Sequence, residues 1–152
     1  MENEADEATV LIESIPGMGK ILAAVVGSEI DDIQRFSSVE KLCAFAGLVP
    51  TTHASGGKIY NGGQLPFCNK HLRWAFIEAS WVSIGCSPYF ATFYRQQRQR
   101  GKKANAAITI VARRMCRIVW QLLHQKRRFH ETQLEEKRRK MKTISPVAPN
   151  CR

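Results

Sequence analysis

A serine followed by two glycines is the part of this sequence best suited to chemistry. Ser55, Gly56 and Gly57 come soon after residues 47–50, whose Gly-Leu-Val-Pro sequence is typical of a helix end. Glycines leave the neighbouring serine hydroxyl accessible and allow backbone dihedral angles that other residues avoid. An exposed hydroxyl of this kind suits a nucleophile or a contact to a phosphate group. The same three residues also occur in ordinary flexible loops, so taken alone they leave both interpretations open.

Cysteine and histidine offer a second kind of chemistry, that of a metal site. Cys68 and His71 have the spacing of half a zinc site, but no second pair in the chain has a matching spacing. The five cysteines are odd in number and widely spaced, which favours reduced thiols over a disulfide framework. No apolar run is long enough to cross a bilayer, and the acidic start of the chain is unlike a signal peptide. We therefore expect no metal in this chain, no membrane partner and a cytoplasmic location.

The charge is divided unevenly along the chain. Residues 1–94 carry six Lys and Arg against ten Asp and Glu, a net charge of −4, whereas residues 95–152 carry seventeen against three, a net charge of +14. A basic half of this strength predicts binding to a polyanion, in the first place nucleic acid. The alternative is a solvated, highly charged helical tail. If nucleic acid binds, the basic surface is expected at Arg113, Arg114, Arg117, Lys126, Arg127 and Arg128.

The elements that position these residues are predicted to be helices. A first short helix is followed by the turn at residues 15–19 (IPGMG), after which apolar residues recur at helical spacing. A Pro-Gly-x-Gly turn between two helices is typical of a helix-hairpin-helix, whose free N–H groups bind a phosphate. We expect Gly17, Gly19 and Lys20 to contact a nucleic-acid backbone. The alternative is a plain connector between two helices.

A second helical hairpin is predicted over residues 30–48. Within it, Ser37 and Glu40 form a capping box, with Ser37 as the N-cap and Glu40 at the third helical position. The helix is expected to stop at Gly47. Residues 48–68 then show no sustained periodicity and contain four glycines, which predicts an irregular Gly-rich loop. A long loop of this kind in a compact domain is usually functional or disordered.

The next part of the chain is predicted to be a helical bundle. It is helical from Asn69, and a second helix starts at Ser87 and ends at Gly101. Asn105 is expected to cap a third helix. The inward residues of the first and third helices are Leu72, Ala75, Phe76, Ala79 and Val82, and Ile108, Val111, Ala112, Met115, Val119, Leu122 and Leu123. The fold class is therefore mostly α, with helix-hairpin-helix elements followed by a helical bundle and an irregular Gly-rich loop between them.

Four segments, taken in order, resemble one protein family. They are residues 15–19 (IPGMG), 36–50 (FSSVEKLCAFAGLVP), 55–58 (SGGK) and 69–75 (NKHLRWA). In this order and spacing they are similar to the C-terminal transposase domain of the insertion-sequence one-ten family and its relatives one-sixteen and nine-oh-two. Each motif alone is weak, whereas the ordered set is specific.

The resemblance also divides the chain into three parts. It covers roughly residues 10–128, which are expected to form the transposase C-terminal domain. Residues 1–9 are expected to be a disordered acidic start. Residues 129–152 are expected to be a charged, largely disordered tail.

The resemblance implies DNA transposition by strand cleavage and rejoining. Ser55 matches the family's serine nucleophile, although members often have two serines here and this chain has Ala54 before Ser55. The hydroxyl would attack a DNA phosphodiester and form a covalent phosphoserine, which keeps the bond energy for rejoining. Arg73 is assigned to the catalytic site, because positioned cations stabilise phosphoryl transfer. Gly56, Gly57 and Lys58 are assigned to nucleic-acid binding.

The family further implies partners for this domain. Its members pair it with an N-terminal RNase-H-like domain that has four acidic metal ligands. Magnesium is therefore expected in that domain, and no cofactor is expected in this chain. DNA is the expected partner, with a guide RNA from the element's own end in the better-studied members, and self-association is expected as well. The location is then the prokaryotic cytoplasm or nucleoid, and the chain alone is expected to be inactive or impaired.

One departure from the family pattern precedes the Leu-Arg pair. Many members have Ile-Thr-Lys-x-Gly-Asn there, whereas residues 64–69 of this chain read QLPFCN, so the lysine and the glycine are absent. Two other functions stay open. One is a non-catalytic helix-hairpin-helix module that binds DNA or RNA, the remnant of a truncated transposase, in which Ser55 only hydrogen-bonds a phosphate. The other is a small basic RNA-binding protein of the translation machinery.

Overall fold

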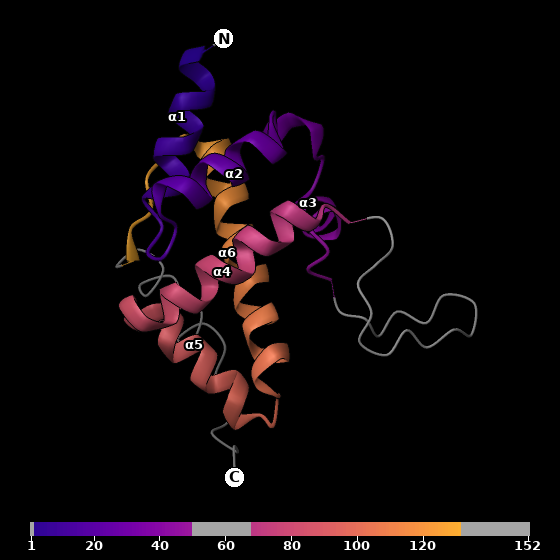
Figure 1. Cartoon of the computed structure of the whole chain (residues 1–152), viewed down its shortest axis with the longest axis vertical. Helices are drawn as coiled ribbons and strands as arrows, with labels where there is room; N and C mark the ends of the chain where they lie inside the picture. Colours follow the sequence, from indigo (N-terminus) through magenta and orange to yellow (C-terminus); the bar gives the residue numbers. More distant parts are fainter. Residues whose placement is uncertain (1, 50–67, 132–152) are drawn as a thin grey trace, which may run out of the picture.

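The computed structural model describes residues 2–49 and 68–131, which form helices and connecting turns without strands. The elements (Figure 1) are α1 (Glu2–Glu13), α2 (Lys20–Ile30), the 3-10 turn η1 (Ile33–Arg35), α3 (Val39–Phe45), α4 (Lys70–Cys86), α5 (Pro88–Gln99) and α6 (Ala104–Gln125). The mostly α fold class predicted from the sequence is confirmed. Within the described residues, no helix combines the length and apolar character needed to span a membrane.

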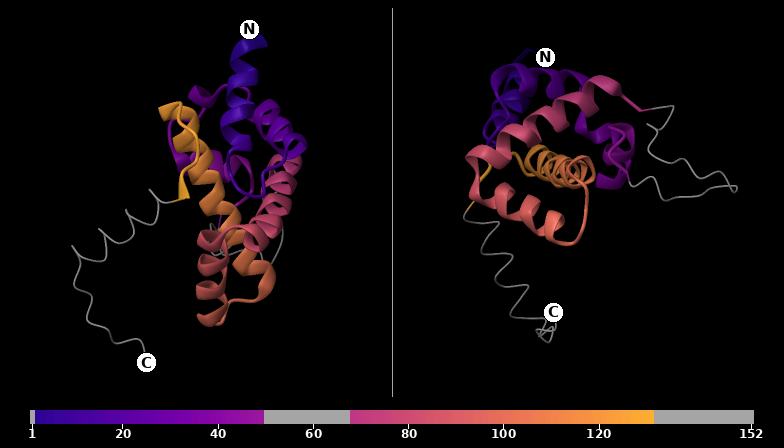
Figure 2. Two further views of the ribbon diagram at one scale, coloured as in Figure 1. Left: turned by 90° about the vertical axis from the view of Figure 1, so that its left-hand side faces the viewer. Right: turned by 60° about the horizontal axis from the view of Figure 1, so that its bottom comes forward.

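Helix α6 is the central element of the fold. It packs against α1, α3, α4 and α5, and the end-on view in Figure 2 shows it enclosed between α4 and α5. Most of the inward residues predicted for this helix are buried, and Leu123 is only partly buried. Side chains that leave α6 in different directions therefore meet different neighbouring helices.

The turn between α1 and α2 is packed against α4. Gly17 has a φ of +90°, and a Cβ on this residue would lie 2.5 Å from the Ala79 carbonyl oxygen and 2.6 Å from the Ser83 nitrogen. Only glycine fits such a close approach of two backbones at a positive φ. By contrast, Gly19 has open space where its Cβ would be, and it is the N-cap of α2. The turn thus fastens the first two helices to the bundle.

The segment between α2 and α4 contains less α-helix than predicted. Asp31 has a φ of +59° and its N–H donates to the Gly27 carbonyl at 2.9 Å, which ends α2. The predicted hairpin over residues 30–48 then consists of η1 and the short helix α3. Gly47, at a φ of +70°, follows the end of α3 as the sequence predicts.

Helix α4 begins directly after Asn69, close to its predicted start, and the predicted cap of α5 is confirmed. Asn69 Oδ1 accepts a hydrogen bond from the Leu72 N–H at 3.0 Å. Ser87 Oγ accepts from the Phe90 N–H, and Pro88 occupies the first position of α5. Each cap satisfies an N–H group that has no acceptor inside its own helix.

Two other predicted caps are wrong. Helix α3 is capped by Ser38 and not by Ser37, so Glu40 occupies its second position instead of its third. Helix α6 begins before Asn105: its N-cap is Lys103, and no side chain caps it. A local sequence pattern is compatible with several neighbouring start positions, and helix packing selects among them.

The inward face of α4 also differs from prediction at one position. Leu72, Ala75, Phe76 and Ala79 are buried as expected, but Val82 is 55% exposed. The buried residue is the adjacent Ser83, because the turn at Gly17 packs against the backbone at Ala79 and Ser83. The polar Ser83 hydroxyl is satisfied within the helix, since it donates to the Ser80 carbonyl at 2.9 Å.

Helical or hydrogen-bonded residues lie beyond both ends of the predicted domain, residues 10–128. Helix α1 starts at Glu2, so residues 2–9 are helical where the sequence predicts a disordered start. At the other end, the Phe129 N–H donates to Ser14 Oγ at 2.8 Å, and the Glu131 carboxylate accepts from Ser87 Oγ at 2.9 Å. These contacts tie residues 129 and 131 to the start of the domain and to α5.

Candidate nucleic-acid interface

The two stretches of chain that flank residues 50–67 are held together. The Asn69 N–H donates to the Phe45 carbonyl at 2.7 Å. Gly47 lies so close to Cys68 that a Cβ on the glycine would be 2.8 Å from the Cys68 Cβ and Sγ. The predicted site residues Ser55, Gly56, Gly57 and Lys58 lie outside the described residues, in the segment whose flanks meet here.

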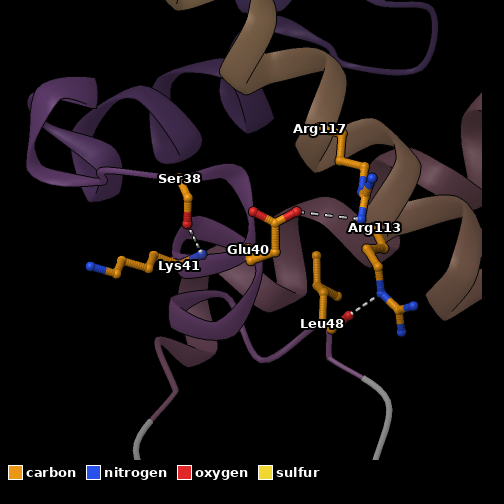
Figure 3. Close-up of polar contacts among 6 residues, drawn as sticks. All are labelled: Ser38, Glu40, Lys41, Leu48, Arg113 and Arg117. Atoms are coloured by element: carbon orange, nitrogen blue, oxygen red, sulfur yellow. Dashed lines mark hydrogen bonds and ion pairs between the residues drawn. The ribbon is translucent and has the colours of Figure 1, made fainter.

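Two arginines bind the chain where it leaves α3. Arg73 of α4 donates from Nη1 to the Gly47 carbonyl at 2.6 Å. Arg113 of α6 donates from Nε to the Leu48 carbonyl at 2.6 Å (Figure 3). No other acceptor within residues 2–49 and 68–131 contacts either guanidinium group. Since each guanidinium has several N–H donors, the remaining ones suit an anion such as phosphate.

Arg117 adds a third positive charge beside Arg113. Its Nη2 lies 3.9 Å from Glu40 Oε1 of α3 (Figure 3), and the two side chains are 50% and 69% exposed. An ion pair this exposed contributes at most about 1 kcal/mol. Burial lowers the pKa of the Arg113 guanidinium, Cys43 opposes this shift, and the charge of Arg117 adds to it. An anion bound here would offset both effects, because it favours the charged form of the arginine.

The place where Arg73 and Arg113 meet the carbonyls of Gly47 and Leu48 forms a corner of the fold. Asn69 connects this corner to α2. Its Oδ1 caps α4, and its Nδ2 donates to Glu29 Oε2 at 2.6 Å. Asn69 was expected as the start of a helix and as part of the family pattern, but nothing in the sequence indicates the contact with Glu29. The two residues are 40 positions apart, and only the packing of α2 against α4 brings them together.

Two buried thiols lie beside the arginines. Cys43 of α3 and Cys116 of α6 are both free cysteines. A hydrogen bond with Cys116 lowers the pKa of Cys43, with burial opposing it and Arg117 adding to it. Burial raises the pKa of Cys116 well above its ordinary value. We assign the pair to the packing of α3 against α6.

The described residues contain no group of three or more His, Cys, Asp or Glu side chains that would hold a metal ion. Cys68 is a free, partly exposed thiol, and His71 is exposed at the start of α4. No other described residue completes a metal site with Cys68 and His71.

A comparison with protein-family models identifies the family of the chain. The model described as Transposase IS116/IS110/IS902 family matches residues 10–95. The chain belongs to this family. The matched range contains Asn69 and Arg73 of the transposase domain, as well as the segment with Ser55, whereas Arg113 lies beyond it.

Curated proteins similar to the transposase domain are much longer than this chain. The protein named "Insertion element IS116 uncharacterized 44.8 kDa protein" from Streptomyces clavuligerus is 29% identical over 124 residues, which are 82% of this chain and 31% of the relative. The pilin gene-inverting proteins of Moraxella bovis and Moraxella lacunata are 33% and 34% identical, over 83% and 78% of this chain and 40% and 38% of the relatives. The chain thus spans about a third of the length of these relatives.

The predicted helix-hairpin-helix contacts lie at the turn between α1 and α2 of the transposase domain. Gly17 is packed against α4, which provides a structural reason for a glycine at this position. Gly19 and Lys20 are exposed at the start of α2. Their contact with a nucleic-acid backbone stays a prediction.

The basic residues predicted on and after α6 are distributed over three places. Arg113 and Arg117 lie beside α3, whereas the Arg114 guanidinium is 4.8 Å from the centre of the Phe93 ring of α5. Past the end of α6, three exposed cations follow one another, namely Lys126, Arg127 and Arg128. Of these residues, Arg113 contacts Leu48, which comes just ahead of residue 50 in the sequence.

Proposed function

We propose that this chain is the serine-bearing part of an insertion-sequence transposase, which binds DNA and cleaves and rejoins its strands. Family membership supports the proposal, and one geometric observation supports a particular place for the DNA. Arg73 and Arg113 hold the carbonyls of Gly47 and Leu48, just ahead of the segment with Ser55. A phosphodiester bound at this corner would meet the positive charge of both guanidinium groups.

In the proposed reaction, Ser55 Oγ attacks the phosphorus of a DNA phosphodiester. A bond between Oγ and phosphorus forms, and the bond from phosphorus to one deoxyribose oxygen breaks. The serine loses its proton, and the departing oxygen takes one up. Arg73, Arg113 and Lys58 would stabilise the charge on the non-bridging oxygens. Attack by a hydroxyl of another strand on the phosphoserine then rejoins the DNA and releases Ser55.

The complete reaction is proposed for a larger assembly. The chain spans only 31% to 40% of the relatives named above, and the resemblance assigns metal binding to an acidic RNase-H-like domain. A guide RNA and further copies of the protein are proposed as partners on the same basis. The prokaryotic cytoplasm is the proposed location.

A covalent adduct assay tests the role of Ser55. The chain is combined with the acidic domain, the guide RNA and labelled target DNA, and protein-bound label is measured after denaturation. We expect Ser55→Ala to abolish the adduct. Thr51→Ala and Thr52→Ala are matched controls, since each removes a hydroxyl from the same segment, and both should retain it. An adduct that persists in Ser55→Ala would overturn the assignment.

The second candidate function is binding without chemistry. It is favoured by the observation that Arg73, Arg113 and Arg117, in the described part of the chain, offer cations for a phosphate backbone. A protein that contacts several phosphates should lose affinity by about 10³-fold or more between about 50 and 200 mM salt. Strong salt dependence without any adduct would favour this function, whereas a flat salt dependence would contradict both candidates.

A further inference from the structure

A second group of positive charges lies around the turn between α5 and α6. This turn cluster consists of five side chains, all of them exposed, namely Arg95, Arg98, Arg100, Lys102 and Lys103. The sequence contains no Asp or Glu between Glu78 and Glu131. Helices α5 and α6 therefore contain no carboxylate that would neutralise the turn cluster.

Hydrogen bonds define the shape of this turn. Arg98 Nη1 donates to the Lys102 carbonyl at 2.9 Å, and the Lys102 N–H donates to the Gln97 carbonyl at 3.2 Å. Gly101, at a φ of +85°, lets the chain reverse between the two helices. The backbone that carries the cations of the turn cluster therefore has a fixed conformation.

The side chains of three members of the turn cluster have no partner in the described part of the chain, namely Arg100, Lys102 and Lys103. The positive charges of these three neighbouring side chains repel one another. Lys102 and Lys103 also precede the first turn of α6, where positive charge opposes the helix dipole and no acidic residue compensates it. Because the stability of the fold does not explain these charges, a partner of opposite charge is the better explanation.

We propose that the turn cluster binds the phosphate backbone of a nucleic acid, as a contact separate from the corner at Arg113. Lys103 lies ten residues before Arg113, which is about 15 Å along α6. Figure 1 shows the turn between α5 and α6 at the lower end of the molecule, away from α3. Clustered lysines and arginines favour backbone contacts that carry no sequence information. The inference extends the nucleic-acid-binding part of the proposed function and rests on it.

The salt dependence of binding tests the turn cluster. The whole chain is titrated with a DNA duplex and with an RNA hairpin of equal length, and fluorescence anisotropy is measured at several salt concentrations. Each phosphate contact contributes about 0.9 to the slope of log affinity against log salt on duplex DNA. The variant R100Q/K102Q/K103Q should therefore lower that slope by about 2 to 3. The matched control R100K/K102R/K103R keeps the charges and should keep the slope.

Each outcome of this experiment has a definite meaning. If the triple variant lowers the slope only for the duplex, DNA is the ligand of the turn cluster. If it lowers the slope only for the hairpin, RNA is the ligand. If it lowers both slopes, the turn cluster binds either backbone. An unchanged slope with both overturns the proposal. If the triple variant unfolds in urea at a lower midpoint than the original chain, Lys102→Gln alone should lower the slope by about one.

The result is also distinguishable from failure of the proposed chemistry. Ser55→Ala should abolish the covalent adduct and leave the salt slope unchanged. The turn variant should lower the slope whether or not an adduct forms. If only the assignment of Ser55 as nucleophile failed, the turn cluster would therefore still be a nucleic-acid contact.

Discussion

The guanidinium of Arg113 donates to the carbonyl of Leu48 at 2.6 Å, although the two residues are 65 positions apart in the sequence. This bond joins the central helix α6 to the chain just ahead of residue 50. Arg73 makes the corresponding bond to Gly47 from α4. The packed helices therefore orient the chain at Gly47 and Leu48, just ahead of residue 50.

Replacing Arg113 with glutamine should weaken both the fold and nucleic-acid binding. The Leu48 carbonyl would lose a charge-assisted partner, so we expect the free energy of unfolding to fall by about 1 to 3 kcal/mol. Urea unfolding and anisotropy titration with a DNA duplex measure the two effects.

Arg114→Gln is the matched control for this variant. It removes the same charge from the next residue, whose guanidinium lies over Phe93 beside α5. We expect a stability loss of about 0.5 to 1 kcal/mol from the lost cation–π contact. Equal losses of affinity in the two variants would show that the corner at Leu48 has no special part in binding.

Gly17→Ala should destabilise the domain by about 2 kcal/mol or more. The added Cβ would lie 2.5 Å from the Ala79 carbonyl oxygen at a positive φ, so the α1–α2 turn would have to move away from α4. Gly19→Ala is the control, because its Cβ would enter open space, and its cost should stay within about 1 kcal/mol. Thermal or urea unfolding compares them, and similar midpoints would contradict the close packing of this turn.

Asn69→Asp should destabilise the corner through Glu29. The aspartate can still cap α4, but it replaces an amide donor 2.6 Å from the Glu29 carboxylate with a second negative charge. We expect a loss of about 1 to 3 kcal/mol at neutral pH, measured by urea unfolding.

Adding Glu29→Gln to that variant should restore most of the loss, because the new amide can donate to Asp at position 69. The four proteins form a double-mutant cycle that isolates the coupling between the two positions. Independent, additive effects would show that Asn69 and Glu29 do not interact in solution.

Much of the helical framework was predictable because its signals are local. Asn69 and Ser87 cap helices, and Gly47 and Gly101 follow helix ends, since these residue types satisfy or release the backbone groups next to them. The predictions failed where a distant element intervenes. Val82 is exposed and Ser83 buried because the turn at Gly17 packs there.

The candidate site was predictable only in part. Arg73 and Arg113 were selected for their charge, but their bonds to Gly47 and Leu48 had no local signal. The contact of Glu131 with Ser87 was missed for the same reason, since it joins a segment expected to be disordered to the start of α5. The turn cluster was visible as charge, yet nothing in the sequence separates it from the corner at Arg113.

The sequence by itself determined the helical character, the family resemblance and the basic second half, because these depend on residue types and their spacing along the chain. Only the tertiary structure decided which cations lie together. It placed Arg113 beside Leu48, turned the adjacent Arg114 toward Phe93 and left Lys103 at the far turn. The physical reason is that the neighbours of each side of α6 are set by the packing of helices distant in sequence, which no local pattern specifies.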